Sequence, residues 1–461
     1  MSTRGIIIAG TASGVGKTSI TLGLLAALGE RTRVGAAKVG PDYIDPHLHA
    51  LAIARPSYNL DPVLTGAAGV MASLARAARH VDLVLVEGVM GLFDGTDLPT
   101  QHQSSEPSPL GSTAQVAKQT ALPVLLIIDC AHLSQSVAAI AHGYRSFDPD
   151  VRVAGVILNH TKSATHEAFV REAMALRGIE VLGVIPHGGL PTRRARHLGL
   201  LTAEEAPEST RGWIDTLGEA IKGFLDLERI VHLAAPIIPP PAPSPSNNLF
   251  QAQDSPSPRP VIAYSEGPAA SFIYPENLER LREAGADIVG FDPRFASIPE
   301  EAGLIWLHGG YPENYREELA ANEPFLGALR QAASAHRPLI AECGGHLVLG
   351  TRLEDSKMAG ILPFSSTISP RLTLGYRLVR ANALDTLLFT KGDQLPAHEF
   401  HYATSTPEGT GLTLTTARAQ WQAGYRRSAL LSSYLHWHLG ANEGLAAQLV
   451  TVAAQHQRQS R

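Results

Sequence analysis

The stretch Gly10-Thr-Ala-Ser-Gly-Val-Gly-Lys17-Thr18 decides the fold of the first half of this chain. It follows a short apolar run, residues 5–9, and precedes a segment with helical character, residues 19–28. A glycine-rich loop between a strand and a helix lets backbone amides converge on phosphate oxygens, and the helix N-terminus adds positive potential. The stretch therefore predicts a phosphate-binding loop.

Four residues of this loop carry the predicted nucleotide contacts. Gly14 and Gly16 free the backbone amides to approach the phosphates, and Lys17 reaches the β- and γ-phosphates of ATP. The hydroxyl of Thr18 helps to hold Mg²⁺. A glycine-rich turn with an incidental Gly-Lys-Thr is the alternative, and the strand–loop–helix context argues against it.

Apolar runs recur along both halves of the chain and predict the α/β class. Runs that are apolar almost throughout suit a parallel sheet covered on both faces, whose sites lie at the carboxyl ends of the strands. The runs in the first half are residues 5–9, 81–86, 123–129 and 153–158, and those in the second half are residues 261–264, 304–307 and 338–341.

Acidic residues follow two of the front strands, where Mg²⁺ would need them. Glu87 ends the run 81–86, and Lys38-Val-Gly-Pro-Asp42-Tyr-Ile-Asp45 places one cation and two acids after another short strand. Glu87 and Asp45 are predicted to join Thr18 at the metal. A simple Gly-Pro-Asp turn is the alternative for the second cluster.

A proline-rich segment divides the chain. From Pro236 to Pro260, nine of 25 residues are proline, which predicts an exposed, semi-extended linker. The predicted organisation is a synthetase domain over residues 1–235, a linker over 236–260 and a second α/β domain over 261–461.

Composition excludes several functional classes. The net charge is -5 with no long basic run, so nucleic acid is not an expected partner. The sequence shows neither a signal peptide nor an apolar run that would span a membrane. Its two cysteines are far apart, which favours a reducing, cytoplasmic location.

Cys343 is predicted to be a nucleophile. It lies in Leu339-Ile-Ala-Glu-Cys343-Gly-Gly-His346, an apolar strand that ends in a cysteine followed by two glycines. Small neighbours permit a sharp strand-to-helix turn, and the helix N-terminus is expected to lower the pKa of the thiol. The alternative, a buried structural cysteine, is the interpretation that fits Cys130.

A cysteine nucleophile also needs a base and an oxyanion hole. Gly309 and Gly310 follow the run 304–307 and are predicted to supply backbone amides to the oxyanion. The candidate bases are His398, His401, His436 and His438. These four histidines could instead bind zinc, but His-Glu-Phe-His does not place both of its rings on one helical face, and no cysteine pair joins the histidines.

Over almost its whole length, the chain resembles the cobyrinic acid a,c-diamide synthases, including the hydrogenobyrinic acid enzymes. The resemblance implies a dethiobiotin-synthetase-like P-loop domain in front of a class I glutamine amidotransferase domain. The strings that carry it are residues 10–18, 38–46, 59–62, 87–95, 155–159, 196–200, 274–278, 309–313, 341–345, 398–402 and 434–436.

By this resemblance, glutamine hydrolysis at Cys343 releases ammonia, and MgATP activates the a- and c-acetate carboxylates of a corrinoid as acyl phosphates. Asn159 would contact the adenine, and His436 would be the base. Lys38, Asp42 and Arg196 are possible substrate or phosphate contacts, and a homodimer is expected. The chain lacks the glutamate that most triad amidotransferases carry two residues after the catalytic histidine, because that position is His438.

Two other functions remain open from the sequence. One is amidation of another tetrapyrrole, such as nickel sirohydrochlorin, or the cobyric acid synthase reaction. The other is a P-loop regulatory ATPase with a degenerate amidotransferase domain. The partition ATPases of that branch carry a second lysine five residues before the P-loop lysine, where this chain has Ala12, which favours a synthetase.

Overall fold

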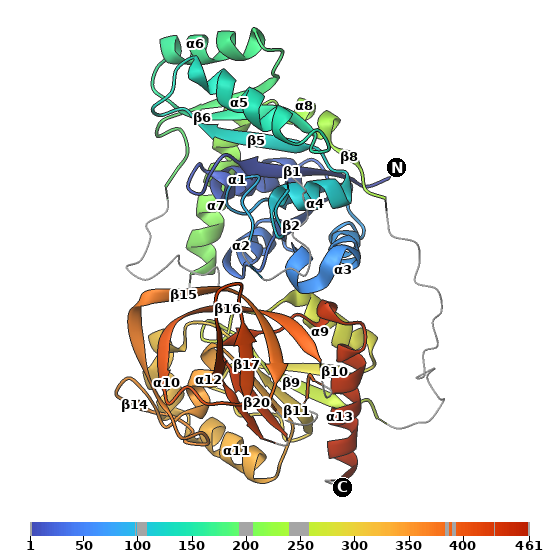
Figure 1. The fold of residues 1–461 in the computed structure, drawn as a ribbon, viewed down its shortest axis with the longest axis vertical. Coiled ribbons are helices and arrows are strands. Elements are labelled where there is room, and N and C mark those ends of the chain that lie inside the picture. The colour runs from blue at the N-terminus through green and yellow to red at the C-terminus, as the bar shows by residue number, and fades with distance from the viewer. Residues whose placement is uncertain are drawn as a thin grey trace. The chain divides into compact units, whose positions relative to one another are not determined.

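The chain divides into two compact units, Met1–Pro240 and Pro241–Arg461 (Figure 1). The computed structural model describes residues 2–96, 98, 108–192, 206–238, 258–382, 387–389, 393–427 and 429–459. Most of the predicted linker, residues 239–257, lies outside these ranges. Among the described helices, none has the length and apolar composition that crossing a bilayer requires.

The first unit is built on one parallel sheet with the strand order β3-β2-β4-β1-β5-β6-β7, and the short β8 pairs antiparallel to β1. The four apolar runs predicted in the first half of the chain all contribute strands to this sheet. Its strands are β1 (Arg4–Gly10), β2 (Val34–Val39), β3 (Ser57–Leu60), β4 (Leu83–Glu87), β5 (Val124–Asp129), β6 (Val153–Thr161), β7 (Val181–Pro186) and β8 (Ala235–Pro236).

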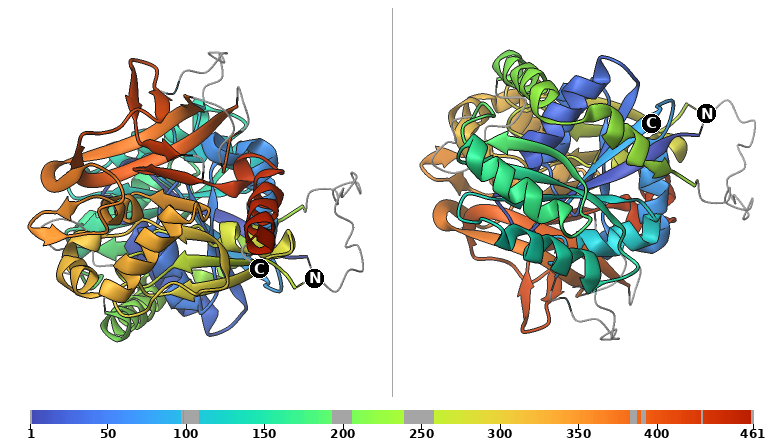
Figure 2. Two further views of the ribbon diagram at one scale, coloured as in Figure 1. Left: turned by 90° about the horizontal axis from the view of Figure 1, so that it is seen from below. Right: turned by 90° about the horizontal axis from the view of Figure 1, so that it is seen from above.

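Helices cover both faces of this sheet, as the views in Figure 2 show. One face is covered by α3 (Pro62–Ala77), α4 (Thr113–Thr120), α5 (Ser136–Phe147) and α6 (Ala164–Ala175). The other face is covered by α1 (Lys17–Gly29), α2 (Ile44–Ile53), α7 (Pro207–Phe224) and α8 (Leu227–Leu233).

Alternation along β1 explains why residues 6–9 are all apolar. Ile7 and Ala9 enter the core under α3 to α6, whereas Ile6 and Ile8 enter the core under α1 and α7. A strand buried on both faces leaves no position for a polar side chain until it ends. Polar residues therefore gather at the carboxyl edge of the sheet, which is where the phosphate loop follows β1.

The second unit contains a predominantly parallel sheet with the strand order β10-β9-β11-β12-β20-β19, in which β19 is antiparallel. The predicted α/β class is thus confirmed for both units. The strands are β9 (Val261–Ser265), β10 (Asp287–Phe291), β11 (Ala302–Leu307), β12 (Leu339–Glu342), β19 (Tyr425–Arg427) and β20 (Leu430–Ser433). The helices are α9 (Pro275–Glu283), α10 (Arg316–Ala321), α11 (Glu323–Ser334), α12 (Gly344–Leu349) and α13 (Leu445–Gln459), with 3-10 turns η1 (Pro312–Tyr315) and η2 (Leu439–Ala441).

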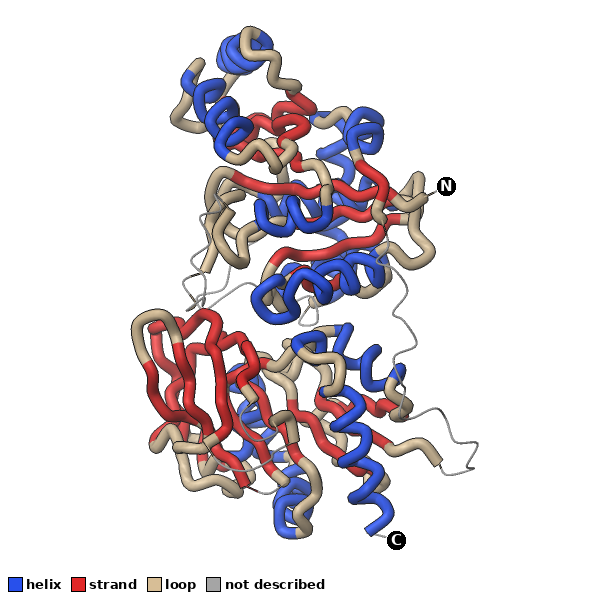
Figure 3. The backbone as a smooth tube through the Cα atoms, turned by 45° about the vertical axis from the view of Figure 1, so that its right-hand side comes forward, coloured by secondary structure: helices blue, strands red, loops and turns tan. Residues whose placement is uncertain are grey.

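A second, mainly antiparallel sheet in this unit was not predicted (Figure 3). Its longest strands, β15 and β16, are 17 and 13 residues long and pair with each other. Their mixed polar and apolar residues lack the continuous apolar character that identified the other strands. The strands are β13 (Arg352–Leu353), β14 (Ser356–Lys357), β15 (Ser365–Ala381), β16 (Gln394–Thr406), β17 (Leu412–Thr415), β18 (Gln420–Ala423) and β21 (Leu435–His436).

Close packing of α1 against α7 yields a prediction for Gly23. A Cβ atom there would lie 2.4 Å from Ile221 Cγ1 and 3.0 Å from the Leu217 carbonyl oxygen. Gly23→Ala should therefore lower the free energy of unfolding by about 1–3 kcal/mol through overpacking. Gly212→Ala is the matched control, because that glycine is exposed on α7 with open space around it. Urea denaturation measures both, and equal effects would contradict the packing argument.

Candidate active sites

The phosphate loop begins where β1 ends and closes onto the first turn of α1. Gly14 and Gly16 have φ angles of 80° and 101°, a backbone region that glycine enters freely. Gly16 caps α1, so the free amides of the first helical turn face the loop. The predicted strand–loop–helix geometry is confirmed.

The Lys17 ammonium donates hydrogen bonds to its own loop and to the loop after β4. Its Nζ donates to the Ala12 carbonyl at 2.9 Å and to the Met90 carbonyl at 2.6 Å. Burial and the neighbouring charge of Lys38 lower the pKa of Lys17. Met90 belongs to the loop after β4 and has a φ angle of 46°, a conformation that non-glycine residues rarely adopt.

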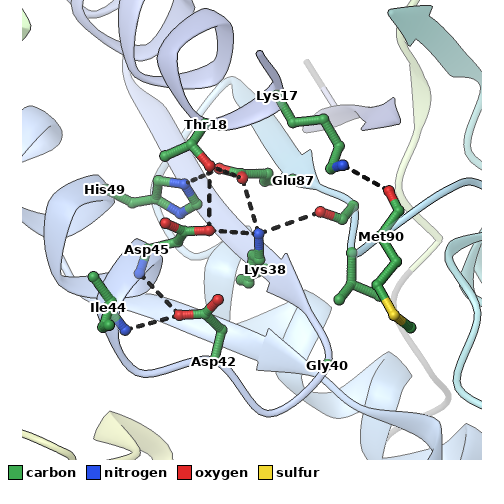
Figure 4. A network of polar contacts seen from close by, with 12 residues as sticks. Lys17, Thr18, Lys38, Gly40, Asp42, Ile44, Asp45, His49, Glu87 and Met90 are labelled. Carbon is green, nitrogen blue, oxygen red and sulfur yellow. Dashed lines mark hydrogen bonds and ion pairs between the residues drawn. The ribbon is translucent and has the colours of Figure 1, made fainter. Parts of the chain in front are cut away.

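Lys38, Asp45 and Glu87 form a buried ion cluster next to Thr18 (Figure 4). Lys38 Nζ lies 2.6 Å from Asp45 Oδ2 and 2.8 Å from Glu87 Oε1. The Thr18 hydroxyl lies 2.7 Å from Glu87 Oε1 and 3.4 Å from Asp45 Oδ2. The structure thus brings together the three side chains predicted to hold a metal, with Lys38 as their counter-charge.

Burial and the charges inside the ion cluster shift the pKa values of its members in opposite directions. Desolvation would lower the pKa of Lys38, but the carboxylates of Asp45 and Glu87 outweigh it and hold that pKa well above its ordinary value. Desolvation would raise the pKa of Glu87, but Lys38 and a hydrogen bond from His49 hold it low. Burial, with the charges of Asp42 and Glu87, raises the pKa of Asp45.

His49 is a site residue that the sequence analysis missed. Its Nε2 lies 2.8 Å from Glu87 Oε2, its Nδ1 lies 3.1 Å from Ser57 Oγ, and its side chain is fully buried. His49 follows Asp45 by four residues on α2, which places both on one helical face. That spacing was the available signal.

Asp42 has a local structural role in this arrangement. Its Oδ1 accepts hydrogen bonds from the amides of Ile44 at 2.8 Å and Asp45 at 3.0 Å (Figure 4). It thereby fixes the first turn of α2, from which Asp45 projects. A substrate contact for Asp42 stays a prediction, and Arg196 lies outside the described residues.

A cavity of about 520 Å³ lies beside the phosphate loop. Asn159, at the end of β6, lines it and braces the loop: its Nδ2 donates to the Val15 carbonyl at 3.0 Å. A Cβ atom on Gly16 would lie 2.6 Å from that nitrogen, so only glycine allows the contact. Other lining residues include Gly14, Lys17, Thr18, His160, His187, Leu190 and Trp213.

Cys343 occupies a strained turn between β12 and α12. Its φ and ψ angles are 45° and -105°, outside the regions that L-residues favour. A Cβ atom on Gly345 would lie 2.5 Å from the Leu307 carbonyl oxygen, so the turn requires a small residue there. This is the predicted nucleophile elbow. Cys130, by contrast, is buried, and desolvation raises the pKa of its thiol to about 12.

Two backbone amides act on the Cys343 thiol. The amides of Gly310 and Gly344 lower its pKa, against the larger effect of burial. Gly344 was missed by the sequence analysis, although an elbow normally offers the amide that follows its nucleophile. A Cβ atom on Gly309 would lie 2.3 Å from His436 Cε1 and 3.1 Å from Cys343 Cβ, so this glycine lets the two side chains approach. An amide contribution from Gly309 stays a prediction.

The expected lowering of the Cys343 pKa by the helix N-terminus is wrong for this structure. Burial raises the pKa of the thiol, Glu313 adds to the rise, and the amides of Gly310 and Gly344 offset only part of it. The side chain is 3% exposed and its sulfur lies 3.2 Å from the Phe400 carbonyl oxygen. Since α12 has only six residues, its dipole is too short to overcome desolvation.

His436 and Cys343 both lie against Gly309. Burial lowers the pKa of His436, with His398, His308 and His401 adding to the effect, so its ring is neutral and able to accept a proton. His398 lies opposite His436 in the pairing of β16 with β21.

The other two candidate bases have local partners. His401 Nε2 lies 3.1 Å from Glu399 Oε1, and its Nδ1 lies 2.6 Å from the Ala403 carbonyl oxygen. His438 Nδ1 accepts a hydrogen bond from the Gly440 amide at 3.0 Å. Gly309 lies against both His436 and Cys343, and this closeness to the nucleophile favours His436 as the base.

Comparisons with known families agree with both sites. Residues 6–198 match the CobQ/CobB/MinD/ParA nucleotide binding domain, and residues 261–444 match the CobB/CobQ-like glutamine amidotransferase domain. A nucleotide-binding domain joined to a glutamine amidotransferase domain defines an amidotransferase of the ATP-dependent, amide-forming class.

Curated relatives match nearly the whole chain. Hydrogenobyrinate a,c-diamide synthase of Streptomyces coelicolor is 38% identical, with 96% of each chain covered. Cobyrinate a,c-diamide synthase of Syntrophotalea carbinolica is 38% identical, with 98% of each covered. Hydrogenobyrinate a,c-diamide synthase of Mycobacterium bovis is 36% identical, covering 98% of this chain and 99% of its own. The chain belongs to the family of hydrogenobyrinate and cobyrinate a,c-diamide synthases.

Lys38 provides a stability test of the ion cluster. Lys38→Met would leave two buried carboxylates without their cation and should cost about 3–5 kcal/mol of unfolding free energy. Lys222→Met is the control, because Lys222 pairs with the exposed Glu30 and should cost no more than about 1 kcal/mol. Chemical denaturation measures both, and a small effect of Lys38→Met would refute the assigned charges.

Cys343 provides a reactivity test of the thiol pKa. Because the thiol is buried and its pKa is raised, iodoacetamide at pH 8 should alkylate it at least about tenfold more slowly than free cysteine, whose pKa is about 8.5. Peptide mass spectrometry separates Cys343 from Cys130 and follows each rate. Alkylation of Cys343 as fast as that of free cysteine would restore the original expectation of a lowered pKa.

Proposed function

We propose that this protein uses ATP and glutamine to amidate the a- and c-acetate carboxylates of hydrogenobyrinic acid or cobyrinic acid in cobalamin biosynthesis. The observation that carries the proposal is the presence, in one chain, of a phosphate loop with an adjoining acid cluster and of a cysteine elbow with a neutral histidine. The activities of the curated relatives supply the corrinoid. Whether cobalt is present in the macrocycle is decided by the assay below.

Glutamine hydrolysis would take place at Cys343. The thiol gives its proton to His436, the sulfur bonds to the side-chain amide carbon of glutamine, and ammonia leaves with that proton. The amides of Gly310 and Gly344, which lower the pKa of the thiol, would stabilise the oxyanion. Water then cleaves the thioester, which releases glutamate and restores the thiol.

Carboxylate activation would take place at the phosphate loop. The γ-phosphoryl group of ATP passes to an oxygen of the acetate side chain, which yields an acyl phosphate and ADP; ammonia then forms the amide as phosphate leaves. Lys17 would exchange its two carbonyl partners for phosphate oxygens. Asn159 would contact the adenine from the cavity wall, and Lys38, Asp42 and Arg196 would face phosphate or substrate.

The oxygen atoms of Thr18, Asp45 and Glu87 suit Mg²⁺, a cation that prefers oxygen ligands and shares them with nucleotide phosphates. Burial and the neighbouring carboxylates of Asp42 and Glu87 raise the pKa of Asp45, and a cation there would offset that repulsion. Bound Mg²⁺ would neutralise charge on the phosphate oxygens. These three side chains would hold it, with water and phosphate completing the shell.

The setting of this reaction is also part of the proposal. ATP and glutamine are cytoplasmic metabolites, so we place the enzyme in the cytoplasm, as a homodimer that needs neither nucleic acid nor a membrane. Light scattering of the purified protein measures its mass.

A substitution at the nucleophile separates the two activities. Cys343→Ser should abolish glutamine hydrolysis, with a loss of about 10³-fold or more, because a serine hydroxyl is far harder to ionise than a thiol. Amidation supported by ammonium and MgATP should be retained, since the phosphate loop is untouched. The assay incubates each variant with cobyrinic acid, hydrogenobyrinic acid or nickel sirohydrochlorin and counts new amides by mass spectrometry.

Lys17→Ala is the matched counterpart, expected to lose amidation from both nitrogen sources. Loss of ammonium-supported amidation in a folded Cys343→Ser protein would refute the two-site account. Amidation of nickel sirohydrochlorin but of neither corrinoid would refute the proposed substrate.

A further inference from the structure

Glu342 directly precedes the nucleophile and is buried beside the proposed base. Its Oε2 lies 3.8 Å from His436 Nδ1, and the two side chains are 3% and 1% exposed. Its Oε1 accepts a hydrogen bond from the Trp437 amide at 3.1 Å. A carboxylate at this place is costly to bury, so its retention next to a histidine calls for a specific reason.

The fold places Glu342 and His436 together through two neighbouring strands. Glu342 pairs with Ser433 in the β12–β20 register, and the Cys343 amide donates to the Ser433 carbonyl at 2.8 Å. The chain then turns into β21, which carries His436. The strand that ends in the nucleophile thus runs beside the strand that leads to the base.

Asn277 fixes the backbone on the far side of His436. Its Nδ2 donates to the Trp437 carbonyl at 2.7 Å, and its Oδ1 accepts from the Leu439 amide at 2.7 Å. The segment that carries the base is therefore held by Glu342 at one amide and by Asn277 at two further groups. Glu342 thus bonds to the backbone of Trp437 and lies next to the imidazole of His436.

Most triad amidotransferases carry a glutamate two residues after the catalytic histidine, and this chain has another residue at that position. His438 occupies it, and its Nδ1 accepts a hydrogen bond from the Gly440 amide while its ring packs against Tyr274. A histidine side chain cannot supply the negative charge that an imidazolium needs beside it. An acid from another part of the chain would meet that need.

We propose that Glu342 is the positioning acid of the glutaminase site, taking the place of the missing glutamate. Its carboxylate accepts a hydrogen bond from the Nδ1–H of His436, which leaves Nε2 free to take the thiol proton of Cys343. The N–O separation must shorten by about 1 Å to reach hydrogen-bond length. No proton passes to Glu342 in the cycle. The inference rests on the proposed function in that glutamine is the substrate.

Other titratable groups lie around Glu342, His436 and Cys343. His308, His398 and His401 face His436, and Glu313 faces Cys343. A protonated Glu342 would donate to Nδ1 and favour the tautomer with hydrogen on Nε2, so that Nε2 could not take the proton of the Cys343 thiol. Burial raises the pKa of Glu342, and the hydrogen bond from the Trp437 amide offsets only part of that rise, so ionisation of Glu342 should limit glutaminase activity on the acid side.

Glu342→Gln tests this role in the full-length protein. The amide keeps the shape and can still accept a hydrogen bond, but it carries no charge. The kcat for glutamine hydrolysis should fall by about 10- to 10⁴-fold, the upper value being the loss when the acid of a Ser-His-Asp triad becomes an amide. KM should change less than about threefold, because substrate contacts are intact. The acid limb of the pH profile should move to lower pH, since the group that must ionise is gone.

Three comparisons complete the design. Glu342→Asp retains the charge on a shorter stem and should recover part of kcat. Glu317→Gln is the matched control, because Glu317 is 84% exposed and remote from the sulfur's partners, and it should behave as wild type. Thermal melting and ammonium-supported amidation of Glu342→Gln should equal wild type.

Wild-type kcat in Glu342→Gln, a change confined to KM, an unmoved acid limb, or loss of the melting transition would each overturn the proposal. The proposed function fails in a different way. If the wild-type protein makes glutamate but amidates no corrinoid with either nitrogen source, the substrate is wrong while the Glu342 result stands.

Discussion

The buried ion cluster of Lys38, Asp45 and Glu87 is the constraint on which the front unit depends. Three charged side chains inside a sheet protein are tolerated only if each finds a partner, and here one ammonium serves two carboxylates. The cluster also links the ends of β2 and β4 and the first turn of α2 to the phosphate loop through Thr18. Binding of nucleotide and metal changes the charge at the phosphate loop, and this change must therefore shift the electrostatic balance of all three side chains.

The two units share one principle of construction. In each, parallel strands buried on both faces end at a common edge, and the reactive groups follow those ends. In the first unit this edge collects the acids around Lys17; in the second it collects the nucleophile and its amides. The second unit adds an antiparallel sheet, and β16 of that sheet brings the Phe400 carbonyl to the sulfur of Cys343.

Sequence patterns predicted the features that are local. The phosphate loop and the Cys343 elbow each depend on a few consecutive residues whose glycines permit one backbone path. His49 and Glu342 were not recognised, because their importance arises from partners 38 and 94 positions away in the chain. The thiol pKa was predicted in the wrong direction, since burial by distant strands cannot be read from the helix that follows the cysteine.

The account depends on an acyl phosphate, which forms at the phosphate loop and reacts with the ammonia that the glutaminase site releases. Oxygen labelling tests this intermediate most directly. The substrate's acetate carboxylates are labelled with ¹⁸O, the reaction is run with MgATP and glutamine, and the inorganic phosphate is examined by mass spectrometry. An acyl phosphate transfers one labelled oxygen to phosphate for each amide formed. Amide formation with unlabelled phosphate would contradict the account.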